Sequence, residues 1–253
     1  MSQSQPLNSA TTGQPPPESL EDDPYICPRT ETVERLATIL DEKRVVHVRG
    51  TPSSGKTTLA ILLWKYYRKR RERVVFLDGW HNVSNPRIHL VNECKARGYY
   101  GVEPHNLTDA NVVFVFDEAQ QSYNDLDLWL GIIKTQSGSH GGPRICLFSS
   151  YGSPTTGPTQ YPLGSTPIQF GPSQRISITA SHFAGNGNMP VCLFYSQEEF
   201  EDVVRRRCPD PTNKFELDLA ARAYLYAITN GHPGATDALF NFISMVCMSC
   251  CIY

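Results

Sequence analysis

The octapeptide Gly-Thr-Pro-Ser-Ser-Gly-Lys-Thr at residues 50–57 constrains the fold of this chain more than any other feature. It matches the pattern G-x-x-x-x-G-K-[ST], which forms a phosphate-binding loop when a strand precedes it and a helix follows it. Residues 44–49 place β-branched side chains at alternate positions, and residues 57–69 are rich in Ala, Leu, Ile and Lys. The first pattern is typical of a strand and the second of a helix. The sequence therefore predicts a strand, a phosphate loop and a helix in direct succession.

Each part of this loop has a chemical role. Gly50 and Gly55 allow backbone N–H groups to approach phosphate oxygens, and the positive end of the following helix adds to the attraction. Lys56 would reach the β- and γ-phosphates, and the Thr57 hydroxyl would bind Mg²⁺. The predicted cofactors are thus a nucleoside triphosphate and Mg²⁺, without a signature that separates ATP from GTP. The candidate nucleotide-binding residues are Gly50, Thr51, Pro52, Ser53, Ser54, Gly55, Lys56, Thr57 and Thr58.

A second part of the site is predicted where the apolar run 111–116 ends in Asp117 and Glu118. Such a run is typical of a central strand covered on both faces, and ligands bind at the carboxyl ends of such strands. Asp117 would bind Mg²⁺ opposite Thr57. Glu118 would orient or deprotonate the water that attacks the γ-phosphate. Hydrolysis is the favoured chemistry, with an ordinary strand end bearing solvated acids as the alternative.

The order of predicted elements indicates an α/β fold. A chain of 253 residues can hold one α/β core and a small appendage. Residues 1–23 contain almost no large apolar side chains and are expected to be a disordered tail. Residues 24–180 are expected to form the core, and residues 190–253 a small C-terminal helical lid that stops abruptly, as in a truncated chain. Alternating strands and helices predict a three-layer sandwich around a five-stranded parallel sheet.

The expected strands are 44–49, 73–80, 111–116, 144–150 and 175–178. The expected helices are 31–41 capped by Thr30, 57–69, 86–98, 126–136, 196–207, 214–229 and one that begins at Pro233. Residues 151–171 are expected to form a long loop near the nucleotide.

Composition limits the classes of partner. A net charge of −2 gives no global attraction to nucleic acid or to anionic membranes. No secretory signal or bilayer-length apolar run is evident, so an intracellular protein, cytoplasmic or nuclear, is expected.

The basic run 65–73 is typical of a solvated helix end, with nuclear targeting or nucleic-acid contact as alternatives. The scattered cysteines 27, 94, 146, 192 and 208 are expected to be reduced thiols, whereas Cys247, Cys250 and Cys251 provide half of a zinc site.

The motifs together carry a family resemblance. With the phosphate loop, the segment Asp117-Glu118-Ala119-Gln120 and the strand end Ser149-Ser150 in that order, the chain resembles the additional-strand class of P-loop NTPases, particularly AAA+ and STAND ATPases, over about residues 28–237. Segments 49–60, 117–123 and 150–154 are similar to the NTPase modules of Crinkler-type effector proteins. The resemblance implies ATP as the nucleotide and Ser149 or Ser150 as the sensor of the γ-phosphate. Arg175 is a candidate arginine finger, with Arg205, Arg206 or Arg207 as alternatives.

Rival functions share parts of this pattern. Asp-Glu-Ala-Gln also occurs in superfamily-one helicases and thymidine kinases, but residues after 178 are too few and too helical for a second helicase domain, and the scattered cysteines do not form a kinase zinc lobe. A further alternative is a nucleotide-gated scaffold with little or no turnover, associating with a protein partner or with itself through the lid. Glu118 favours hydrolysis over this alternative.

Overall fold

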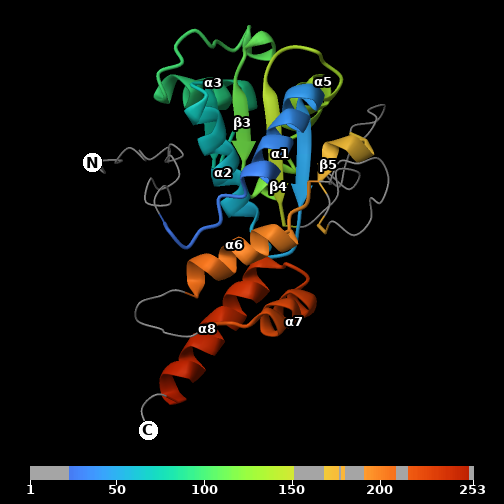
Figure 1. Ribbon diagram of the computed structural model, residues 1–253. Helices are drawn as coiled ribbons and strands as arrows, with labels where there is room; N and C mark the ends of the chain where they lie inside the picture. The colour runs from blue at the N-terminus through green and yellow to red at the C-terminus, as the bar shows by residue number, and fades with distance from the viewer. Residues whose placement is uncertain (1–22, 151–167, 177, 180–190, 209–215, 251–253) are drawn as a thin grey trace, which may run out of the picture.

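A five-stranded, wholly parallel sheet forms the centre of the computed structural model, which describes residues 23–150, 168–176, 178–179, 191–208 and 216–250 (Figure 1). The strand order is β2-β3-β4-β1-β5. The strands are β1 (Val45–Arg49), β2 (Val74–Leu77), β3 (Val113–Phe116), β4 (Arg144–Ser149) and β5 (Arg175–Ile176). Because β4 lies between β1 and β3, the strand before the phosphate loop and the strand before the two acids are not neighbours.

Helices cover both faces of the sheet. The helices are α1 (Thr30–Lys43), α2 (Lys56–Lys69), α3 (Pro86–Ala96), α4 (Leu126–Leu128), α5 (Lys134–Ser137), α6 (Gln197–Arg207), α7 (Leu219–Thr229) and α8 (Pro233–Cys250). Short segments η2 (Leu107–Asp109), η3 (Ala119–Ser122), η4 (Trp129–Ile133) and η6 (Pro172–Gln174) complete the described elements. This is the α/β sandwich with a five-stranded parallel sheet that the sequence predicts.

Alternate residues of each strand enter different cores, as the two-residue period of a strand requires. Val46 and Val48 of β1 pack with α1 and α2 on one face, whereas Val45 packs with α3 and η4 on the other. Strand β3 divides in the same way, with Val115 in the first core and Phe116 in the second. All four residues of β3 are buried, which is why its sequence is a continuous apolar run.

The three C-terminal helices form a separate apolar cluster below the carboxyl ends of the strands (Figure 1). Phe200 of α6, Leu225 of α7 and Phe240 of α8 are its main contacts, and Cys27 from the segment before α1 joins it. Ser196 and Glu199 form the predicted capping box at the start of α6. The third helix of the group begins at Pro233, as predicted.

Several predicted boundaries were wrong. Thr30 does not cap the first helix: Arg29 is the capping residue, with φ of 48°, because its carbonyl accepts the first helical hydrogen bond from Val33. Strand β2 ends at Leu77 and β5 at Ile176, so Trp80 lies beyond its predicted strand.

The predicted helix 126–136 forms in three parts, because Trp129–Ile133 adopt π-helical hydrogen bonding. The predicted helix 214–229 begins later, at Leu219, where the Asp218 side chain accepts a hydrogen bond from the Ala221 N–H. Cysteines 27, 94, 146, 192 and 208 are free and buried, as predicted.

Three predictions fall outside the described residues: most of the N-terminal tail (residues 1–22), most of the long loop (residues 151–167), and the side chains of Cys247, Cys250 and Cys251. Within the described part of the chain, no helix is long and apolar enough to cross a membrane.

Candidate nucleotide and magnesium site

The predicted phosphate loop connects β1 to α2 at the carboxyl edge of the sheet. The Gly50 N–H donates to the Ser149 carbonyl at 3.2 Å, which continues the β1–β4 pairing by one residue. A Cβ atom at Gly50 would lie 2.2 Å from Leu193 Cδ2 and 2.6 Å from Ser54 Oγ, so no other residue fits here without displacement. Gly55 has a φ of 84°, in the left-handed region that favours glycine. Gly55 is therefore favoured by its backbone conformation, whereas a side chain at Gly50 would displace the ends of Leu193 and Ser54.

Lys56 is held inside the loop. Its ammonium group donates to the Thr51 carbonyl at 2.8 Å, and the Ser54 hydroxyl donates to the same oxygen at 2.6 Å. Burial lowers the pKa of Lys56, and the nearby carboxylates of Glu118 and Asp117 oppose that effect. The loop thus concentrates positive charge and backbone N–H groups at one point, opposite two acids.

The buried carboxylate of Asp117 has one orphaned oxygen. The Asp117 N–H donates to the Leu77 carbonyl, which fixes the residue at the end of β3. Burial raises the pKa of Asp117, and the side-chain hydrogen bond with Thr57 partly offsets this rise. Among the described residues, Asp117 Oδ1 finds no hydrogen-bond partner. Because a buried unpaired carboxylate oxygen is costly, this atom is suited to a ligand from outside the protein.

The donor set at this point fits Mg²⁺. The Thr57 hydroxyl and the Asp117 carboxylate are hard oxygen ligands, and Mg²⁺ takes few protein ligands, completing its shell with water and phosphate oxygens. Within the described residues, no group of three or more His, Cys, Asp and Glu side chains could hold a metal ion by itself. A cation here would therefore depend on a bound phosphate.

Glu118 follows Asp117 in the chain, but its side chain makes different contacts. Its backbone has a φ of 52°, in the left-handed region, where a non-glycine residue is under strain. Its carboxylate accepts a hydrogen bond from the Gln120 side-chain amide, whose oxygen accepts from the Ser150 N–H at 3.0 Å. Sequence reasoning missed Gln120, although its position in Asp-Glu-Ala-Gln is a signal for it.

The two candidate sensor serines have different surroundings. Ser149 is fully buried, and its hydroxyl lies 2.7 Å from Nε2 of His47, a buried residue of β1. Burial, together with Arg49 and Arg175, lowers the pKa of His47 to about 4, so this histidine is neutral near pH 7. Ser150 is half-buried and follows β4 directly beside the loop.

Arg175, the candidate arginine finger, is exposed at the start of β5. It pairs with His47, two residues before β1 ends, and not with the phosphate loop. The alternatives Arg205 and Arg206 form ion pairs with Asp202, and Arg207 with Asp237. The structure therefore places all four candidates away from the contacts of Lys56, Asp117 and Glu118.

The start of α8 contacts the phosphate loop, a feature that sequence reasoning only partly anticipated. The Gly234 N–H donates to the Ser53 carbonyl at 2.9 Å, and a Cβ atom at Gly55 would lie 3.0 Å from Pro233 Cγ. His232 Nε2 lies 3.4 Å from the Thr51 hydroxyl. The Gly-His-Pro-Gly segment at residues 231–234 was the available signal for this contact.

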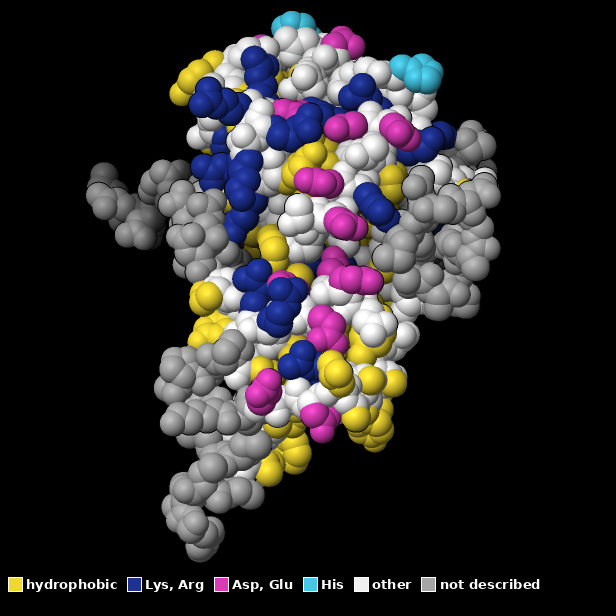
Figure 2. Space-filling model, in the orientation of Figure 1, with side chains coloured by type: hydrophobic (Ala, Val, Ile, Leu, Met, Phe, Trp, Pro, Cys, Tyr) yellow, Lys and Arg dark blue, Asp and Glu magenta, His cyan; other side chains and the backbone are white. Residues whose placement is uncertain are grey.

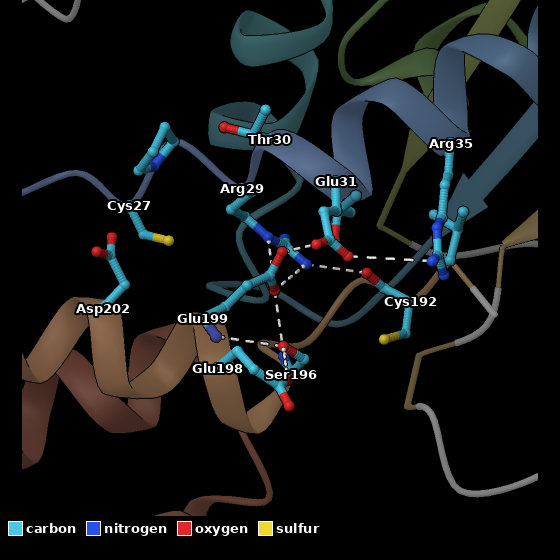
Figure 3. A pocket seen from close by; sticks show the side chains of 13 residues that line it. Cys27, Arg29, Thr30, Glu31, Arg35, Cys192, Ser196, Glu198, Glu199 and Asp202 are labelled. Atoms are coloured by element: carbon cyan, nitrogen blue, oxygen red, sulfur yellow. Dashed lines mark hydrogen bonds and ion pairs between the residues drawn. The ribbon is translucent and has the colours of Figure 1, made fainter. Parts of the chain in front are cut away.

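A cavity of about 380 Å³ lies between the segment before α1 and the start of α6 (Figure 3). Arg29 extends across its floor, where its guanidinium group donates to the carbonyls of Cys192 and Leu193 at 2.9 and 2.8 Å. The same group pairs with the Glu199 carboxylate at 3.0 Å. These contacts tie the beginning of the core to the segment that leads into the C-terminal helices.

Comparisons with known proteins add little to this geometry. No protein-family model matches the chain, and no curated protein matches its sequence. Among solved structures, the chain is similar to one described as the Thermotoga maritima RuvB Holliday junction branch migration motor, at 15% identity and a TM-score of 0.41. The match covers 84% of this chain and spans 60% of the RuvB chain. No inference about activity or partners follows from a likeness this weak.

The fold itself defines the class. A parallel sheet in the order β2-β3-β4-β1-β5, a phosphate-loop motif between β1 and α2, and a buried aspartate after β3 are together the fold of P-loop NTPases. The extra strand β4 between β1 and β3 is consistent with the additional-strand arrangement that the sequence indicates.

Proposed function

We propose that this protein binds a nucleoside triphosphate with Mg²⁺ at the phosphate loop and hydrolyses it. The observation that carries this proposal is the orphaned, buried Oδ1 of Asp117, beside the Thr57 hydroxyl and within the field of Lys56. A structural ion pair would leave no such atom unpaired, whereas a phosphate-bound cation would satisfy it.

In the proposed reaction, the loop N–H groups between Gly50 and Thr57 hold the phosphates and Lys56 leaves the Thr51 carbonyl to contact the β- and γ-oxygens. Bound Mg²⁺, held by Thr57 and Asp117, would offset the charge that develops on the phosphate oxygens. Glu118 takes a proton from water as the water oxygen bonds to the γ-phosphorus. The bond between that phosphorus and the β–γ bridging oxygen breaks, and the diphosphate leaves.

Ser150 is the better of the two sensor candidates. The Ser149 hydroxyl is engaged with His47, whereas Ser150 lies at the loop and beside Gln120. We expect the Ser150 hydroxyl to contact the γ-phosphate or the attacking water. Arg175 would need a rearrangement of β5, or a second copy of the chain, to reach a γ-phosphate.

We further propose that residues 190–253 act as a lid on a core of residues 24–180, and that nucleotide state sets the position of α8. Ser53, inside the phosphate loop, accepts a hydrogen bond from Gly234, so a change in the loop reaches α8 directly. This coupling supports a conformational switch, and the family resemblance of the sequence leads us to propose the AAA+ or STAND type with ATP as its nucleotide. The narrower similarity to Crinkler-type modules is part of the same proposal.

The test is binding and steady-state hydrolysis of ATP and GTP with Mg²⁺, after removal of copurified nucleotide. We expect Lys56→Ala to weaken triphosphate binding at least tenfold, because the cation that contacts the phosphates is lost. Glu118→Gln should bind like the parent but hydrolyse about a hundredfold more slowly. Equal affinity in the parent and Lys56→Ala would contradict the site assignment.

The alternative function, a nucleotide-gated scaffold, is favoured by one specific observation. Helix α7 carries exposed apolar side chains: Leu219, Tyr224 and Ile228 are 80%, 65% and 52% exposed (Figure 2). Exposed apolar side chains of this size are suited to contact with a protein partner or a second copy of the chain. Tight binding without turnover in both the parent and Glu118→Gln, with nucleotide-dependent self-association in sedimentation, would support the scaffold instead.

A further inference from the structure

One peptide group lies between the phosphate loop and the proposed general base. The Ser149 carbonyl accepts the Gly50 N–H at 3.2 Å, and the Ser150 N–H donates to Gln120 Oε1 at 3.0 Å. This carbonyl and this N–H belong to the same peptide unit, and in a trans peptide they point in opposite directions. Because β4 lies between β1 and β3, the unit joins the loop that follows β1 to the turn that follows β3.

Gln120 completes this chain of contacts. Its amide nitrogen donates to the Glu118 carboxylate while its amide oxygen accepts from Ser150. Only one orientation of the amide satisfies both partners, because a carboxylate cannot donate and a backbone N–H cannot accept. The side chain is half-buried, and it lies in the η3 turn that begins directly after Glu118.

We propose that Gln120 is a positioning residue, which aligns Glu118 with the phosphate loop through the Ser149–Ser150 peptide. When the loop closes around a triphosphate, Gly50 moves the peptide, the peptide moves Gln120, and Gln120 turns the Glu118 carboxylate towards the attacking water. The backbone of Glu118 has a φ of 52°, a strained conformation that persists only where surrounding contacts hold it. This inference rests on the proposed hydrolysis. It adds Gln120 as the residue that makes the position of the Glu118 carboxylate depend on the conformation of the phosphate loop.

The test uses the full chain with two substitutions of Gln120. Gln120→Leu removes both contacts and should lower kcat about tenfold to a hundredfold, with KM within about threefold of the parent, because a misplaced base slows the chemical step. Gln120→Glu keeps an acceptor for Ser150 but places a second carboxylate against Glu118. The new carboxylate cannot donate to Glu118, so kcat should fall by a similar factor while KM stays within about threefold of the parent.

Gln121 supplies a matched control from the same turn. Its side chain accepts from the Trp80 N–H at 2.8 Å and has no hydrogen bond to Glu118 or Ser150 among those described. Gln121→Leu should therefore keep the kcat and the KM of the parent, even if it lowers stability. Equal losses of kcat in Gln120→Leu and Gln121→Leu would overturn the proposal, since the turn alone would then explain the effect.

A second readout is independent of turnover. Trp129 donates from Nε1 to the Ser122 hydroxyl, in the turn that contains Gln120, at 3.1 Å. A non-hydrolysable ATP analogue should change tryptophan fluorescence in the parent and in Gln121→Leu, but less than half as much in Gln120→Leu. If the parent binds and hydrolyses ATP while both Gln120 variants match it in kcat and fluorescence, the proposal fails and the proposed function stands. If the parent does not bind nucleotide, both fail.

Discussion

At the scale of a single residue, the buried carboxylate of Asp117 lowers the stability of the folded chain near neutral pH. Burial raises its pKa, so the folded chain binds this proton more tightly than the unfolded chain. The corresponding contribution to stability is greatest at low pH and is lost as pH rises through the folded pKa. Near neutral pH the ionised, half-unpaired carboxylate therefore destabilises the fold, and the proposed Mg²⁺ would offset this cost when bound.

We predict that Asp117→Asn stabilises the free protein at pH 7 by about 1 kcal/mol, or a few degrees in Tm, because the charge is removed while the Thr57 hydrogen bond can remain. The same variant should gain no thermal stability from Mg²⁺ with ATP. Thermal unfolding with and without Mg²⁺–ATP measures both effects. A variant that is less stable than the parent at pH 7, or that is still stabilised by Mg²⁺–ATP, would show that Asp117 is a structural acid.

At the scale of elements, the decisive contact is between the phosphate loop and the first turn of α8. Gly234 lies so close to the loop that an added Cβ atom would be 2.6 Å from Ser53 Cβ and 2.7 Å from the Ser53 carbonyl oxygen. The obstructing atoms are backbone or next to it, so the helix or the loop would have to move. Nucleotide affinity and the position of α8 should then depend on each other.

We predict that Gly234→Ala destabilises the protein by about 1–3 kcal/mol, although Ala in a helix is ordinarily favoured over Gly by about 1 kcal/mol. ATP affinity should fall about tenfold as the loop is displaced. Gly131→Ala is the matched control, because an added Cβ at Gly131, in η4, meets no described atom within 4 Å. Chemical unfolding and nucleotide titration of both variants provide the comparison. Similar stability changes in the two variants would show that the α8 contact is loose.

For the whole molecule, an ion pair joins the start of the core to the first of the three C-terminal helices. Arg29 precedes α1 and Glu199 lies in α6, and their side chains are 2% and 12% exposed. Glu199 also accepts from the Thr32 hydroxyl at 2.5 Å and from the Ser196 N–H at 3.1 Å. Because these groups are buried and mutually satisfied, the pair fixes where the C-terminal helices attach to the core.

We predict that Arg29→Met lowers the free energy of unfolding by about 3 kcal/mol, since the Glu199 carboxylate and three carbonyls lose their donor. Glu31→Gln, which breaks an exposed pair with Arg35 at 4.0 Å, should change it by less than about 0.5 kcal/mol. Urea unfolding of both variants tests this difference. A loss below about 1 kcal/mol in Arg29→Met would mean that other contacts hold the C-terminal helices to the core.

Basic side chains form a column on the surface beside α2 (Figure 2). Arg68 lies over the Trp64 ring at 4.6 Å, and Arg70 pairs with Glu72 at 2.8 Å. Lys69 lies in the last turn of the helix. These positions agree with the solvated helix end expected from the sequence, where positive charge complements the helix dipole.

The sequence by itself determined the local parts of this protein. The phosphate loop, the five strands, the buried acidic end of β3 and the capping box of α6 could be predicted, because each depends on residues within one turn or one strand of each other. Such patterns fix backbone conformation and burial, and these in turn fix the loop and the position of Asp117.

Only the tertiary structure decided which distant groups meet. The Ser149 hydroxyl bonds with His47, the Ser149–Ser150 peptide bridges Gly50 and Gln120, and Arg29 pairs with Glu199, across 102, 30 and 170 residues respectively. The order of strands places β4 between β1 and β3, and the packing of α6 to α8 places Gly234 against Ser53. Periodicity within a segment records which side of it is buried, but not which other segment covers it, so these partners follow from packing alone.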